Sequence, residues 1–174
     1  MQNRLTLLAQ QVGEKLSDLQ QKVTTAESCT AGGIAEVITR VAGSSNWFEV
    51  GYITYSNHQK TNVLNVDATI LRQKGAVSQA VAEQMAQSAL KQSGADYSVA
   101  VSGIAGPDGG SVEKPVGTVW CAWSCATETV STQYLFSGDR IAVREQTIEA
   151  ALLGILLQLN DRKLNKRLDV RNNK

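Results

Sequence analysis

Hydrophobic residues near the start of the chain follow a helical period. Between residues 3 and 20 they recur mostly at intervals of three or four, at Leu5, Leu7, Leu8, Val12, Leu16 and Leu19. This spacing predicts an amphipathic helix, because residues three and four apart lie on one helix face. The β-prone run Val23–Ala26 follows and stops at the charged residue Glu27. We therefore expect a helix and then a short strand.

The rest of the chain alternates between the same two patterns. Asp67, Ser78 and Asp139 are predicted helix N-caps, and Gly94 is a predicted helix end. The predicted strands are 23–26, 50–55, 97–102, 116–125 and 130–136. The predicted helices are 3–20, 32–40, 57–65, 67–74, 78–94 and 139–164.

Strands that alternate with helices predict an α/β domain in which helices cover a sheet. The two last strands, separated by the short segment ATET, are typical of a β-hairpin. We therefore expect a layered α/β/α domain with a mixed sheet, parallel at the crossovers and antiparallel at the hairpin. The domain is predicted to span residues 1–164, and the basic residues 165–174 are predicted to form a C-terminal tail.

The composition agrees with one globular domain. The chain has 174 residues, of which 43% are hydrophobic and two are proline, and this is enough to build a core. The formal net charge is +1, so no strong field favours nucleic acid. The N-terminus has no apolar stretch of the signal-peptide type, and the longest apolar run, Ala150–Leu159, is too short to span a membrane. We expect neither nucleic acid nor a membrane as a partner.

The number and spacing of the cysteines indicate a reducing compartment and do not indicate a metal site. There are three, Cys29, Cys121 and Cys125, an odd number without the spacing of a disulfide framework. This favours a reducing cytoplasm. With one histidine and poorly spaced cysteines, a metal site is not expected, and neither is another cofactor.

Candidate chemistry concentrates in the stretch TTAESCTAGG, residues 24–33. The predicted strand ends at Glu27 and a helix is predicted to start near Cys29, so Ser28 lies at the turn between them. Backbone N–H groups at a helix start stabilise an anion, either a phosphate or the oxyanion of an acyl transfer. Ser28 is therefore a candidate nucleophile. The alternative is an ordinary N-cap serine, and the lysine of a P-loop is absent.

A serine or cysteine nucleophile needs a base, and two residues compete for that role. His58 is the single histidine, but its polar segment is typical of a protein surface. Lys60 follows the predicted strand 50–55 and acts as a base only if burial or a nearby cation lowers its pKa. Tyr55 in the same segment is a candidate proton donor or relay, with a half-buried strand aromatic as the alternative. These residues alone leave His58 and Lys60 open.

Two further segments suit an anionic ligand. The long loop GIAGPDGGSVEKPVG, residues 103–117, contains glycines that allow a close approach of its backbone to a ligand. Arg140 and Arg144 lie four residues apart at the start of the last predicted helix and fit a phosphate or a carboxylate. The alternatives are a tight surface loop and a solvated helix face.

Five blocks of sequence, in order, resemble one known family. They are TTAESCTAGG, GSSNWFEVGYITYSNHQK, GAVS, VSGIAGPDGGSVEKPVGTVW and FSGDRIAVR. Together they are similar to the CinA C-terminal domain family, and within it to the stand-alone nicotinamide-nucleotide amidohydrolases. The resemblance covers about residues 5–160. It implies hydrolysis of nicotinamide mononucleotide to nicotinate mononucleotide and ammonia in pyridine nucleotide (NAD) salvage. It also implies a Ser/Lys dyad without a metal, and a homodimer.

Carried onto this chain, the resemblance assigns the nucleophile to Ser28 and the base to Lys60, and it matches Tyr55 to a tyrosine of the family. The candidate substrate-binding residues are Cys29, Thr30, Ser45, Ser102, Gly103, Gly106, Arg140 and Arg144. One departure is Ala31, which stands where the family has glycine. We expect its methyl group to be tolerated inside a helix.

A second function from another class is a catalytically silent nucleotide-binding module that acts through protein partners. The presence of both Ser28 and Lys60 favours the enzyme, because a binding module does not need this pair.

Overall fold

The computed structural model describes the backbone of residues 2–172 and the side chains of residues 3–160. Five strands form one sheet in the order β2–β1–β3–β4–β5. β1 pairs in parallel with β2 and β3, whereas the β3–β4 and β4–β5 pairs are antiparallel. The strands are β1 Val23–Glu27, β2 Phe48–Ile53, β3 Tyr97–Gly103, β4 Thr118–Cys125 and β5 Thr129–Leu135.

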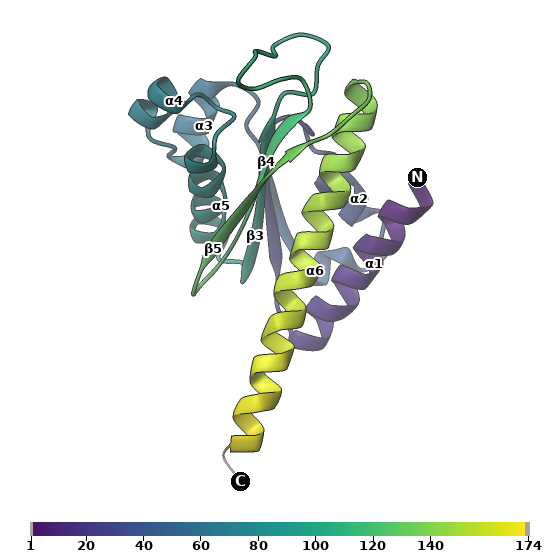
Figure 1. The fold of residues 1–174 in the computed structure, drawn as a ribbon. Helices are drawn as coiled ribbons and strands as arrows, with labels where there is room; N and C mark the ends of the chain where they lie inside the picture. The colour runs from purple at the N-terminus through teal and green to yellow at the C-terminus, as the bar shows by residue number, and fades with distance from the viewer. Residues whose placement is uncertain (1, 173–174) are drawn as a thin grey trace.

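Helices cover both faces of this sheet (Figure 1). α1, α2 and α6 pack on one face, and α3, α4 and α5 lie over the other. The predicted α/β/α layers and the mixed sheet are therefore confirmed. The helices are α1 Gln2–Leu19, α2 Gly33–Thr39, α3 Asn57–Leu64, α4 Ala68–Lys74, α5 Gln79–Ser93 and α6 Arg140–Asn172, with a 3-10 turn η1 at Ser44–Asn46.

The two faces of the sheet bury side chains of different size. Val99, Val101 and Trp123 belong to the core shared with α1, α2 and α6. Ala100 and Ala122 belong to the core shared with α5. Successive residues of a strand point to opposite faces, so the alternation of large and small residues in β3 and β4 sets how closely each helix layer approaches the sheet.

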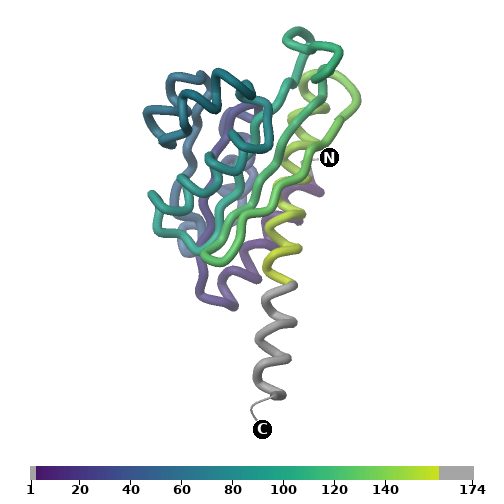
Figure 2. Tube along the Cα trace, turned by 60° about the vertical axis from the view of Figure 1, so that its left-hand side comes forward, coloured from purple at the N-terminus to yellow at the C-terminus, as the bar shows by residue number. Residues whose placement is uncertain are grey.

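Parallel pairing brings the carboxyl ends of β1, β2 and β3 to one edge of the sheet. The segments that leave this edge are the turn after Glu27, the residues that lead into α3, and the long loop 104–117. Figure 2 shows this loop and the start of α6 at the same end of the molecule. Open α/β sheets bind ligands at this edge, so these segments define where a site is expected.

Two of the predicted helix caps form as expected. The Asp67 carboxylate caps α4, and the Asp139 carboxylate accepts a hydrogen bond from a backbone N–H in the first turn of α6. Ser78 directly precedes α5, but its hydroxyl donates to the Gly75 carbonyl and does not cap the helix. Segment 165–174, the predicted basic tail, lies beyond the residues whose side chains are described.

No helix in the described part of the chain combines the length and the apolar character that crossing a bilayer requires.

Candidate active site

The chain makes a tight turn between β1 and α2. α2 begins at Gly33, and Ala31 and Gly32 before it both have left-handed backbone, with φ of 49° and 94°. The helix predicted for residues 32–40 forms as α2, but the expectation that it starts near Cys29 is wrong. These two left-handed residues form a tight turn in place of a first helical turn. Ser28, directly after β1, lies in this connection at the edge of the sheet.

The anion at the start of α2 is Glu27, the last residue of β1. Its side chain is fully buried. One carboxylate oxygen accepts hydrogen bonds from the Thr30 hydroxyl at 2.6 Å and from the N–H groups of Gly32 and Ile34, each at 3.0 Å. The other oxygen accepts from the Ala35 N–H at 2.9 Å.

These hydrogen bonds to Glu27 change the role expected for the start of α2, which was to bind an anion of the substrate. The N–H groups that open α2 already stabilise a carboxylate of the protein itself, so they do not face a substrate oxyanion. Sequence reasoning gave Glu27 no role beyond ending a strand. The available signal was a carboxylate placed a few residues before a helix start, which is an arrangement that favours capping.

Ser28 and Lys60 form a hydrogen-bonded pair. The Lys60 Nζ donates to Ser28 Oγ at 2.8 Å, to the Thr54 carbonyl at 2.8 Å and to the Tyr55 carbonyl at 3.4 Å. Ser28 is buried, and Lys60 is only 1% exposed. The structure therefore brings together the two residues that the sequence proposes as nucleophile and base.

Burial lowers the pKa of Lys60 to about 8, because the charged ammonium loses its water while the neutral amine loses little. α3 accounts for the burial. Lys60 and Leu64, four residues apart, lie on its inner face. His58 and Asn62, also four apart, are exposed and contact each other. The structure thus separates the two candidate bases, and only Lys60 reaches Ser28.

The Cys29 thiol is a poor competitor for the role of nucleophile. Its side chain is 5% exposed, and burial is the main reason that the pKa of the thiol rises to about 12. A thiol attacks as the thiolate, and this environment disfavours that form.

A cavity of about 290 Å³ opens beside Ser28 and Cys29. Ser102, Gly103, Gly106 and Arg140, which are predicted to bind substrate, line it, and so does Tyr55, the predicted proton relay. The remaining lining residues are Ala76, Val77, Ile104, Ala105, Asp108 and Gly109.

Arg140 ties three segments together at this cavity. One of its guanidinium nitrogens donates to the Gly106 carbonyl at 2.9 Å and another donates to the Tyr55 hydroxyl at 3.0 Å. The start of α6, the loop after β3 and the segment after β2 therefore meet around one cation, which faces the same space as Ser28.

Three of the proposed substrate-binding residues lie outside the cavity lining. The Thr30 hydroxyl is buried on Glu27, and Arg144 donates to the Thr30 carbonyl at 2.7 Å. Both residues therefore stabilise the turn between β1 and α2 and do not line the cavity. Ser45 is in η1, before the amino end of β2, which pairs with Val23. Because β1 and β2 are parallel, this places Ser45 at the opposite edge of the sheet from Ser28.

Within the described residues, no three side chains of the histidine, cysteine, aspartate and glutamate types gather in a metal-binding group.

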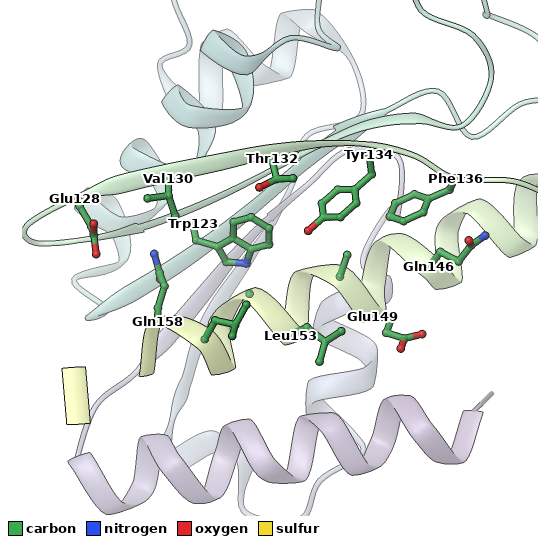
Figure 3. Close-up of a pocket in the computed structure, with 13 residues that line it drawn as sticks. Trp123, Glu128, Val130, Thr132, Tyr134, Phe136, Gln146, Glu149, Leu153 and Gln158 are labelled. Atoms are coloured by element: carbon green, nitrogen blue, oxygen red, sulfur yellow. The ribbon is translucent and has the colours of Figure 1, made fainter. Parts of the chain in front are cut away.

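A larger cavity, about 640 Å³, lies between the β4–β5 hairpin and α6 (Figure 3). Its wall is mainly apolar, with Trp123, Tyr134, Phe136 and Leu153 around it. The Trp123 indole N–H is already bonded to the Ala151 carbonyl. The labelled residues of Figure 3 include no nucleophile paired with a base, so the smaller cavity at Ser28 is the candidate active site.

Comparisons with known proteins identify the family of the chain. The family model described as the CinA C-terminal domain matches residues 5–159. The chain belongs to this family. The match contains every segment that meets at the cavity, from the turn after β1 to the start of α6.

Curated relatives resemble the chain over most of its length. A protein of Pseudomonas putida named nicotinamide-nucleotide amidohydrolase PncC is 59% identical, over 87% of this chain and 95% of its own length. A protein of Escherichia coli K12 with the same name is 54% identical, over 86% and 92%. A longer CinA-like protein of Akkermansia muciniphila is 49% identical, and only 34% of its length is matched.

Solved structures show the same fold. A CinA superfamily protein of Klebsiella pneumoniae superposes with a TM-score of 0.87 at 35% identity, covering 90% of this chain and 98% of that one. A competence/damage-inducible protein of Agrobacterium tumefaciens superposes with a TM-score of 0.86 at 40% identity, covering 90% and 95%.

Replacing Glu27 with glutamine should weaken both the fold and the site. The amide has one acceptor oxygen instead of two, and its NH₂ group would face N–H donors. Hydrogen bonds to charged groups contribute about 1.5–3 kcal/mol, so we expect a loss of about 2–3 kcal/mol of unfolding free energy and about a tenfold fall in kcat. Urea unfolding and steady-state kinetics measure these effects. Asp67→Ala, which removes the cap of α4, is the control: it should lower the unfolding free energy by about 1 kcal/mol and leave kcat unchanged.

Replacing Ala31 with glycine should stabilise the protein. The expectation that this methyl group lies inside a helix is wrong, because Ala31 precedes α2 and has left-handed backbone. Such a conformation costs a residue with a Cβ about 1–2 kcal/mol, and the freer unfolded chain of glycine offsets about 0.4–1 kcal/mol of that. We expect a net gain of about 0.5–1 kcal/mol, measured as a higher urea midpoint. A lower midpoint would contradict the strain at this turn.

Proposed function

We propose that the protein hydrolyses the carboxamide of nicotinamide mononucleotide to nicotinate mononucleotide and ammonia. The observation that carries the proposal is the 2.8 Å hydrogen bond between Lys60 Nζ and Ser28 Oγ, made by a buried lysine whose pKa lies near 8. A lysine that is partly neutral near pH 8 acts as a general base toward a serine that it already contacts. The names and identities of the curated relatives support the choice of substrate.

The first half of the reaction acylates the enzyme. Neutral Lys60 accepts the proton of Ser28 Oγ as that oxygen attacks the carboxamide carbon. The tetrahedral intermediate then collapses, and the C–N bond breaks. The Lys60 ammonium returns the proton to the leaving nitrogen, which departs as ammonia. The product of this half is an ester between Ser28 and the nicotinate group.

The second half releases the acid. A water molecule attacks the ester carbon and gives a proton to Lys60. The C–O bond to Ser28 breaks, and Lys60 passes the proton to Ser28 Oγ, which restores the starting state. The acid so formed loses its remaining proton to solvent, and nicotinate mononucleotide leaves with a carboxylate in place of the carboxamide. Tyr55, whose hydroxyl contacts Arg140, is the proposed relay for protons at the mouth of the site.

The substrate phosphate is proposed to bind Arg140. It is the one cationic residue among those that line the cavity, and its guanidinium retains donors beyond the two bonds to Gly106 and Tyr55. The tight glycines of the neighbouring loop let the backbone approach the same anion.

Ammonia release tests the proposal directly. The purified protein is incubated with nicotinamide mononucleotide, and ammonia is measured with a coupled glutamate dehydrogenase assay while the nucleotide product is identified by mass. We expect one ammonia for each nicotinate mononucleotide formed. Binding of the nucleotide without any ammonia would favour the catalytically silent module that acts through protein partners.

The wider setting is also part of the proposal. Because its product is a nicotinate nucleotide, the reaction belongs to pyridine nucleotide (NAD) salvage in the cytoplasm. From the family resemblance we propose that the protein is a homodimer. Light scattering at assay concentration should give twice the mass of the chain, and a monomeric mass would contradict this.

A further inference from the structure

The cavity at Ser28 contains two opposite charges that do not pair with each other. Of its thirteen lining residues, two are charged, Asp108 and Arg140. The Arg140 guanidinium donates to Gly106 and Tyr55 instead of to the carboxylate. Asp108 takes part in none of the ion pairs and side-chain hydrogen bonds found within the described residues. Its charge is thus left for something that enters the cavity.

The backbone, not its own contacts, holds Asp108 at the cavity wall. A Cβ on Gly106 would lie 2.5 Å from Val116 Cγ1, and one on Gly110 would lie 2.8 Å from the Val116 backbone nitrogen. Gly109 has left-handed backbone, with φ +90°. The loop is therefore packed down on both sides of Asp108 by close approaches that only glycine permits.

We propose that Asp108 is a specificity-determining residue that recognises the positive charge on the aromatic ring of the substrate. The inference rests on the proposed function. In nicotinamide mononucleotide, the ring that carries the carboxamide also holds a quaternary nitrogen with a fixed positive charge, and the phosphate at the other end is negative. With the carboxamide at Ser28 and the phosphate at Arg140, the Asp108 carboxylate supplies the opposite charge for the ring.

This arrangement selects among carboxamides by ring charge. A cationic heteroaryl amide gains an attraction that a neutral ring of the same shape lacks. Asp108 is exposed to solvent, so water and salt screen part of the attraction until the ligand displaces water from the wall. We expect Asp108 to contribute about five- to tenfold to the affinity for the cationic ring.

Two ligands isolate the ring charge. Nicotinamide mononucleotide and its reduced 1,4-dihydro form share the carboxamide, the ribose and the phosphate, but the reduced ring is neutral. Calorimetry in the Ser28→Ala background gives the Kd of each ligand without turnover. Asp108→Asn should raise the Kd of the oxidised form about five- to tenfold and change that of the reduced form less than twofold. The effect should shrink in 0.5 M NaCl, as expected for a screened charge of about this strength.

The control is Glu113→Gln, which removes a carboxylate from the same loop outside the cavity lining. It should change neither Kd. Equal changes for both ligands in Asp108→Asn would mean that Asp108 shapes the loop, and no change would mean that it does not meet the ring; either result overturns the inference. The proposed function has a separate outcome: if the wild-type protein releases no ammonia from nicotinamide mononucleotide, the function itself fails.

Discussion

Replacing Ser28 with alanine should lower kcat for ammonia release by about 10⁴-fold or more, because it removes the proposed nucleophile and with it the proposed acyl-enzyme route. Substrate affinity should stay within about threefold of the wild-type value, since the substitution deletes one hydroxyl and leaves the cavity wall intact. Single-turnover kinetics and calorimetry measure the two quantities.

The control for Ser28 is its neighbour. Cys29→Ala should retain substantial activity, because the buried thiol is held in its protonated form. Ammonia release at the wild-type rate by Ser28→Ala, together with inactivity of Cys29→Ala, would assign the nucleophile to the thiol and contradict the proposed mechanism.

Replacing Lys60 with arginine should lower kcat for ammonia release by about 10³-fold or more. A guanidinium keeps its proton throughout the usable pH range and cannot accept the proton of Ser28. Lys60→Met, an unbranched side chain one atom shorter and without a charge, should be equally inactive. Circular dichroism of both variants checks that the fold survives. His58→Ala should keep the wild-type rate and pH profile, since His58 lies on the outer face of α3.

The dependence of kcat/KM on pH tests whether Lys60 acts in its neutral form. The proposed base is the neutral amine, and burial lowers the pKa of Lys60 from 10.5 to about 8. The neutral fraction therefore increases as pH rises through 8, so kcat/KM should climb tenfold per pH unit below that value and level off above it. A profile that instead climbs through about 6.5 and is lost in His58→Ala would assign the base to the histidine.

Periodicity was sufficient to predict the fold and insufficient to orient the site. The leucines of α1 carry a strong helical period, β4 and β5 are β-prone runs on either side of a short turn, and all three elements form as expected. α3 carries almost none: in NHQKTNVL the apolar residues are the last two, so the pattern does not say that Lys60 is on the inner face. Its orientation depends on packing against the rest of the domain, which local sequence does not encode.

The turn after β1 illustrates the same limit. Propensity treats Ala31 as a good helix residue, yet the buried carboxylate of Glu27 collects the N–H groups of Gly32, Ile34 and Ala35 and fixes a left-handed approach to α2. Similarly, Ser45 lies in a polar segment and was predicted to bind substrate. It precedes the amino end of β2, however, and the parallel pairing of β1 and β2 places it at the edge of the sheet opposite to Ser28. Tertiary contacts decided both cases.

Ser28 directly follows β1, and Lys60 lies on α3, which comes after the neighbouring parallel strand β2. The N–H of Thr54, the residue after β2, joins the two segments by donating to the Glu27 carbonyl at 2.9 Å. Thr54 also accepts from Lys60, so this one connection sets the reach of the lysine toward the serine that follows Glu27. Activity then depends on a contact between two segments that are separate in sequence, and such a contact forms only when the chain between them closes into a loop. During refolding, the rate at which ammonia release returns would therefore report the rate at which β1 pairs with β2.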